Sequence, residues 1–200
     1  MRKLLLGLLC LTFIINIQAQ TPKMVLKTNI LPVLMGQIFG TSEYRIVYEQ
    51  AMPETPHALA IGASYNSIPF LLNASDIIQN LKVDGYRIQL QYKLYIGKGK
   101  TAPDGFYISP HFSYNTARFS RKSAPSDYLQ VHLMNINGLV GYQLITSGNF
   151  ALDIFSGLGF KSNSADIVAN TSDDFDDLNE NLPLGTGPKF TLGFNFGLAF

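Results

Sequence analysis

The stretch YRIQLQYKLYI, residues 86–96, alternates two kinds of side chain with a period of two residues. Every even position is aliphatic or aromatic, whereas Arg87, Gln89, Gln91 and Lys93 occupy four of the odd positions. Successive side chains of a β-strand point to opposite faces, and a helix would scatter this pattern around its axis. The stretch therefore predicts a β-strand with one apolar face and one polar, partly charged face.

The same alternation recurs along the chain after residue 23, in segments of roughly ten residues. No run of 18 apolar residues occurs in this region, so a membrane-spanning helix is not expected there. We predict eight strands, at 24–34, 43–49, 58–66, 86–96, 106–118, 129–144, 150–161 and 189–200. The last of them, which ends on Phe200, carries an apolar row opposite small or polar residues. An even number of such strands is typical of bacterial outer-membrane barrels.

The connections between these segments fall into two length classes. Residues 52–56, 97–105 and 146–149 form short or moderate connections, whereas 69–85 and 162–188 are long. If the chain runs up and down, both long connections lie at the same end, as the external loops of outer-membrane barrels do. The predicted fold is therefore all-β, an eight-stranded antiparallel up-and-down transmembrane β-barrel.

The first nineteen residues have the features of a secretory signal peptide. Arg2 and Lys3 precede the apolar stretch 4–15, and the small residue Ala19 stands before the expected cleavage point. We therefore predict a signal peptide over 1–19, a barrel domain over 20–200 and a location in the cell outer membrane. The only cysteine, Cys10, lies in the signal peptide, so the mature chain would have no disulfide, thiolate ligand or cysteine nucleophile.

A soluble lipocalin-like cup is the alternative architecture, with its apolar face turned inward around a ligand. Two observations favour the membrane barrel. Tyr and Phe gather near the strand ends, as in an aromatic girdle, and the opposite faces carry many small residues. One such row is Ala58, Ala60, Gly62 and Ser64, which suits a narrow lumen.

Four motifs also resemble a known family. They are Lys27-Thr-Asn-Ile-Leu-Pro32, Tyr48-Glu-Gln50, Gln91-Tyr-Lys-Leu-Tyr95 and Ala102-Pro-Asp-Gly-Phe-Tyr-Ile-Ser-Pro110. In these motifs the chain is similar to small outer-membrane barrels of Bacteroidota, of the OmpA/OmpX type, that are known only as a domain of unknown function. The resemblance implies a barrel in the outer membrane and supplies no catalytic residues.

In a membrane barrel with an apolar outside, the polar strand faces must line the lumen. An eight-stranded barrel is just wide enough for side chains to fill it, so charges there should pair. We expect a lumen polar network of Lys27, Asn29, Glu43, Arg45, Glu49, Arg87, Gln89, Gln91, Lys93 and Asp153, with Asn137 and Asn195 as further amides. Its members Lys27, Glu49, Lys93 and Asp153 fall near the periplasmic strand ends and balance in charge. The sequence thus predicts a plugged or very narrow lumen.

A barrel without an open lumen is expected to have a structural role or to act through its loops. The stretch 70–83 has the spacing of a short amphipathic helix that could bind an extracellular protein. The stretch 166–180 is rich in acidic residues, and we interpret it as a solvated loop rather than as a calcium site. Arg118, Arg121 and Lys122 lie where the rim could contact lipopolysaccharide. We expect outer-membrane lipid, lipopolysaccharide and an extracellular protein as partners; a small-solute channel is the alternative function.

Other functional classes find less support in the sequence. The formal net charge is +1, so nucleic acid is not an expected partner. One strand face carries Ser109, His111 and Ser113, and Glu49 or Asp153 could complete the catalytic triad of a lipid-modifying enzyme. That face points into the lumen, however, where a lipid acyl chain cannot reach. His57 and His132 look isolated. We therefore predict no catalytic residues, cofactor or metal.

Overall fold

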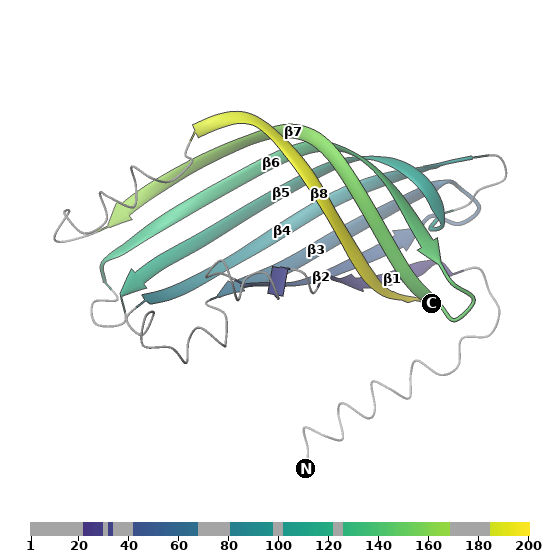
Figure 1. The fold of residues 1–200 in the computed structure, drawn as a ribbon, viewed down its shortest axis with the longest axis horizontal. Helices are drawn as coiled ribbons and strands as arrows, with labels where there is room; N and C mark the ends of the chain where they lie inside the picture. The colour runs from purple at the N-terminus through teal and green to yellow at the C-terminus, as the bar shows by residue number, and fades with distance from the viewer. Residues whose placement is uncertain are drawn as a thin grey trace, which may run out of the picture.

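The protein is described by a computed structural model that covers residues 22–29, 32–33, 42–67, 81–97, 102–121, 126–168 and 185–200. Its strands are β1 (Met24–Thr28), β2 (Ser42–Ala51), β3 (His57–Ser67), β4 (Leu81–Ile96), β5 (Gly105–Arg121), β6 (Tyr128–Ile145), β7 (Phe150–Val168) and β8 (Gly185–Ala199). Each strand pairs antiparallel with the next, and β1 also pairs with β8, so the sheet closes into a ring (Figure 1). The predicted number, order and direction of the strands are confirmed.

The two-residue alternation becomes the two faces of this ring. On β4, Arg87, Gln89, Gln91 and Lys93 face the interior of the ring, which we call the bore, and Lys93 is completely buried. The intervening side chains of Tyr86, Ile88 and Leu90 are exposed on the outside. The backbone pleat thus sorts polar residues inward and apolar residues outward, in the sense that the sequence predicts.

Several strands are longer than predicted at the end of the ring that carries the long connections. β4 begins at Leu81, β5 continues to Arg121, β7 continues to Val168 and β8 begins at Gly185. Gly, Asp and Pro in these extensions resemble loop residues, but pairing with an already formed neighbouring strand outweighs their low strand propensity.

The observed strand ends correct four predictions. Residues 81–83 of the predicted 70–83 helix belong to β4, Asp166 of the predicted acidic loop lies in β7, and Arg121 lies in β5, as does Arg118, the last residue of the predicted strand. The strand predicted over 24–34 ends at Thr28. Outside the described residues lie the predicted signal peptide, Lys122, residues 70–80 and residues 169–180.

Short turns and the closure of the ring share the opposite end. The β2–β3 turn is held by a hydrogen bond from the Met52 amide to the His57 carbonyl (2.8 Å), and the β6–β7 turn contains Asn149 at φ 62°. Asn tolerates this left-handed conformation better than most residues. At the same end the amide of Phe200 donates to the carbonyl of Met24 (2.8 Å), which places the C-terminus beside β1 (Figure 1).

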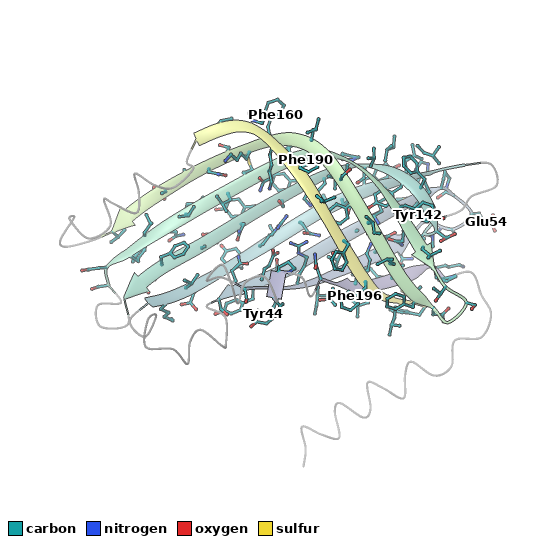
Figure 2. All side chains as sticks on the ribbon, in the orientation of Figure 1. Tyr44, Glu54, Tyr142, Phe160, Phe190 and Phe196 are labelled. Carbon is teal, nitrogen blue, oxygen red and sulfur yellow. The ribbon has the colours of Figure 1, made fainter. Side chains whose placement is uncertain are left out.

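The outer face of the ring is strongly apolar. Leu158, Phe160, Phe190 and Leu192 on β7 and β8 expose 66–72% of their surface, and similar side chains continue around the other strands. Figure 2 shows the labelled Phe160 and Tyr44 extending from opposite sides of the ring. Within the described residues, no helix is both long enough and apolar enough to cross a membrane.

Candidate functional site

Four charged side chains from four strands meet inside the bore. Lys27 on β1 lies 2.5 Å from Glu49 on β2 and 2.7 Å from Asp153 on β7. Lys93 on β4 contacts the same two carboxylates, each at 2.9 Å. All four residues are at most 2% exposed. This four-ion cluster brings together the members of the predicted network that lie nearest the short turns.

Neutral groups complete the hydrogen bonding of the cluster. The Oε1 atom of Gln143 accepts from the Nζ atoms of Lys27 (2.9 Å) and Lys93 (2.8 Å), and its amide group donates to the carbonyl of Pro103 (2.7 Å). The hydroxyl of Tyr95 donates to Glu49 (2.6 Å), and that of Tyr107 donates to Asp153 (2.7 Å). Each buried charge therefore has several partners, as burial of ions requires.

Sequence reasoning missed these neutral partners, although the signal for them was present. Tyr95 continues the inward-facing odd positions of β4, and Tyr107 and Gln143 occupy the inward positions of β5 and β6. A search for charges and amides on the best-defined strands passes over aromatic residues, which are usually assigned to the membrane face. The Lys93 ammonium also lies 4.0 Å from the centroid of the Tyr107 ring, in a cation–π contact.

The cluster fills the cross-section of the bore near the short turns. Its four ions come from β1, β2, β4 and β7, and hydrogen bonds join the two lysines across the interior through Asp153 and through Gln143 of β6. Below it pack Ala51, Ala58, Tyr95, Ala102 and Tyr107. A solute that crossed this layer would have to separate ion pairs in a poorly hydrated interior, which costs several kcal/mol per ion.

Gly141 on β6 makes room for the Tyr107 side chain. A Cβ atom at Gly141 would lie 2.5 Å from the Tyr107 hydroxyl oxygen and 2.8 Å from the carbonyl oxygen of Ile154, whereas one at Gly138 would meet nothing closer than 3.9 Å. We expect Gly141→Ala to lower the free energy of unfolding by about 1–3 kcal/mol through overpacking. Gly138→Ala, the control on the same strand, should be neutral or slightly stabilising. Equal urea midpoints for the two variants would contradict this reading.

A second polar group occupies the bore on the side of the long connections, a region that we call the upper bore. Arg45 makes two hydrogen bonds to Glu43, from Nε at 3.0 Å and from Nη2 at 2.7 Å, and the Ser64 hydroxyl donates to Glu43 at 2.6 Å. Arg87 lies 3.6 Å from Glu43 and donates to the Ser113 hydroxyl at 3.2 Å. Glu43, Arg45 and Arg87 thus lie together on the bore side of the ring.

The remaining predicted network residues also face the bore. Asn29, Gln89 and Gln91 are at least nine-tenths buried, as are Asn137 and Asn195. Asn29, Gln89, Gln91 and Asn195 line a cavity in the upper bore, next to Arg45 and Arg87. Asn137 instead makes hydrogen bonds with His111 and Thr191. The network therefore divides into two layers, of which only the first is fully paired.

The residues considered for a lipid-modifying triad have separate partners. His111 contacts the Asn137 amide at 3.1 Å, Ser113 accepts hydrogen bonds from Arg87 and Asn135, and Ser109 donates to the carbonyl of Pro110. Glu49 and Asp153 belong to the four-ion cluster. The described contacts do not join these five residues into one hydroxyl–imidazole–carboxylate set.

The other two histidines are not isolated, contrary to the sequence interpretation. His57 accepts or donates a hydrogen bond at 2.8 Å with the Tyr92 hydroxyl, and His132 does so at 2.7 Å with Tyr114. Each pair joins neighbouring strands and stacks its rings. In the part of the chain that the structure describes, no group of three or more His, Cys, Asp or Glu side chains could hold a metal ion.

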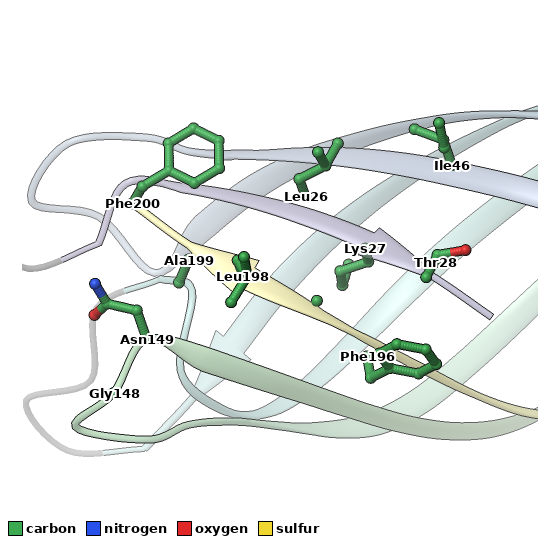
Figure 3. Close-up of a pocket in the computed structure, with 11 residues that line it drawn as sticks. Leu26, Lys27, Thr28, Ile46, Gly148, Asn149, Phe196, Leu198, Ala199 and Phe200 are labelled. Atoms are coloured by element: carbon green, nitrogen blue, oxygen red, sulfur yellow. The ribbon is translucent and has the colours of Figure 1, made fainter. Parts of the chain in front are cut away.

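A further hollow of about 450 Å³ lies at the seam between β1 and β8. The apolar side chains along it include Leu26, Ile46, Phe196, Leu198 and Phe200, gathered near the end of the chain (Figure 3). Leu26, Ile46 and Leu198 are exposed on the outer face. Lys27 of the four-ion cluster and the buried Ala199 also contribute to the lining of this hollow.

Comparison of the chain with models of protein families, with curated proteins and with solved structures gives no match.

Proposed function

We propose that this chain is an integral outer-membrane protein, a transmembrane β-barrel whose bore is closed by the four-ion cluster. The observation that carries the proposal is the inverted distribution of polarity around the ring. Lysine, glutamate and aspartate are buried inside, while Ile, Leu and Phe cover the outside. In lipid, all backbone groups of a closed sheet are paired between strands, and the outward apolar side chains meet acyl chains.

A water-soluble cup would require the opposite arrangement. Its apolar side chains would fill the interior around a ligand, and its charges would face water. Here the largest fully buried side chains include Lys27, Lys93, Gln143, Glu49 and Asp153. Exposing a continuous apolar surface to water would instead favour aggregation. The burial pattern therefore supports the membrane barrel over the soluble cup.

The proposed role is structural or interactive rather than transport through the bore. Paired ions and packed tyrosines close the bore near the short turns, which leaves the long connections as the parts available to partners. We place those connections outside the cell, with an extracellular protein and lipopolysaccharide as the proposed partners, and the short turns in the periplasm, as in known barrels. Signal-directed export and the resemblance to Bacteroidota barrels are consistent with this location.

The proposal can be tested with the full-length protein in cells. Heat-sensitive gel mobility and recovery in the outer-membrane fraction are the expected results, because closed barrels resist unfolding by detergent until heated. A stable protein in the soluble periplasmic fraction, with unchanged mobility after heating, would contradict membrane insertion.

Ion conductance separates a closed barrel from a small-solute channel, the alternative function. We expect the folded protein to give no reproducible openings in a planar bilayer, because the four-ion cluster spans the bore. A known outer-membrane channel inserted by the same protocol serves as the positive control. Discrete, repeatable openings from protein with verified heat-sensitive mobility would show that the cluster moves and would favour the channel.

A further inference from the structure

Charge in the bore is divided unevenly between its two layers. The four-ion cluster holds two ammonium groups and two carboxylates and is neutral. In the upper bore, Arg45, Arg87 and Lys189 face a single carboxylate, Glu43, and Lys161 lies diagonally across from Lys189 on the next strand. Among the described residues, other acidic side chains near this level, such as Asp84 and Asp166, are on the outer face or exposed. The described side chains of the upper bore therefore carry an excess of positive charge.

A cavity of about 290 Å³ lies among these cationic groups. Arg45, Arg87, Lys189, His111 and the amides of Gln89, Gln91, Asn29 and Asn195 contribute to its lining. At roughly 30 Å³ per water molecule, it has room for about ten waters. The four-ion cluster lies between this cavity and the short turns, and Phe190 and Leu192, which are exposed on the outer face of β8, also contribute to the lining.

Several buried polar atoms around this cavity have no hydrogen-bond partner in the described part of the chain. The buried side-chain atoms without a hydrogen bond among the described residues are Arg87 Nε, Gln89 Oε1, Gln91 Nε2 and Asn195 Oδ1. All four of their residues line the cavity. Arg87 Nε and Gln91 Nε2 are donors that an oxyanion could use, whereas Gln89 Oε1 and Asn195 Oδ1 are acceptors that need a donor such as water.

We propose that the cavity is a binding site for a small oxyanion, a chemical class that includes phosphate, sulfate and carboxylates. Water could satisfy the unpartnered atoms, but it would leave the excess positive charge of the described lining residues uncompensated. The guanidinium of Arg87 and the ammonium of Lys189 are suitable donors for oxyanion oxygens. A cation is disfavoured, because Glu43 already accepts from Arg45 and Ser64.

The inference goes beyond the proposed function and does not depend on membrane insertion. Its test is calorimetric titration of the folded, full mature chain in a non-ionic maltoside detergent, with inorganic phosphate, sulfate or chloride at constant ionic strength. We expect saturable binding of phosphate or sulfate at one site per chain and much weaker binding of chloride. Equal binding of chloride would overturn an oxyanion site, and so would the absence of binding to protein with verified heat-sensitive mobility.

Substitutions of the cationic lining residues test whether this cavity is the binding site. Lys189→Gln removes a half-buried ammonium whose protein hydrogen bond is to Asn135, so the variant should fold, and we expect at least tenfold weaker oxyanion binding. Arg87→Gln should have a similar effect, and the double variant should show no binding. Lys82→Gln is the charge-matched control, because Lys82 is exposed and pairs with Asp84. Unchanged affinity in Lys189→Gln and Arg87→Gln, or an equal loss in Lys82→Gln, would overturn the assignment.

Discussion

Replacing Asp153 by Asn is expected to lower the free energy of unfolding by about 3–5 kcal/mol, because it removes one partner of a buried ion pair and leaves the other charge buried. The Oδ2 atom of Asp153 accepts from both Lys27 and Lys93, at 2.7 and 2.9 Å. Asn preserves the shape of the side chain but removes its charge, which leaves two buried ammonium groups facing only Glu49. The measurement is urea unfolding of the protein folded in lipid vesicles, followed by gel mobility and circular dichroism, since the chain has no tryptophan.

Two controls separate charge imbalance from loss of shape. The double variant Asp153→Asn with Lys93→Met restores neutrality in the cluster and should recover a large part of the lost stability, because well-packed neutral replacements of buried ions are often tolerated. Asp84→Asn removes a carboxylate from an exposed ion pair with Lys82 and should change stability by at most about 1 kcal/mol. If Asp153→Asn unfolds at the wild-type urea concentration, the cluster contributes nothing as a charge-balanced unit.

Replacing Ile88 by Arg on the outer face is expected to destabilise the protein in a bilayer by about 2–4 kcal/mol, the cost of a basic side chain near the midplane. Ile88 lies in the middle of β4, pairs with Ala63 and Tyr114 across the two ladders and is 53% exposed. The guanidinium would therefore face acyl chains. The measurement is the folded fraction in vesicles as a function of urea concentration.

The matched control for this variant is Thr186→Arg. Thr186 is exposed at the start of β8, at the end of the ring with the long connections, where the cost of a basic side chain should fall to about 0–1 kcal/mol. The difference between the two positions reports depth in lipid rather than a general effect of arginine. If Ile88→Arg is neutral or improves solubility in water, the outer face does not contact lipid and the membrane proposal is wrong.

Much of the four-ion cluster could be predicted because each member lies on a strand with clear alternation. Lys93 is one of the inward positions of the alternating stretch 86–96. The inward positions of Lys27, Glu49 and Asp153 are predicted from the same two-residue alternation on their own strands. Their approximate level in the bore follows from distance to the short turns. Their individual pairings could not be predicted, because these depend on the tilt and register of strands that are far apart in the chain.

The errors at the strand ends have a related cause. Gly185, Gly187 and Pro188 resemble a loop locally, but β8 pairs there with residues 160–163 of β7. The extension carries Lys161 and Lys189 into the upper bore as neighbours. Sequence reasoning treated both residues as the ends of strands, and it therefore missed the excess of positive charge and the cavity that this charge surrounds.

By itself, the sequence determined the number of strands, their order and the face on which each side chain lies. These properties follow from a two-residue backbone repeat and from the lengths of the connections, both of which are local. Only the tertiary structure decided which inward residues touch. Gln143 joins Lys27 and Lys93 although it lies 116 and 50 residues from them, because closure of the ring brings β1, β4 and β6 around one narrow interior.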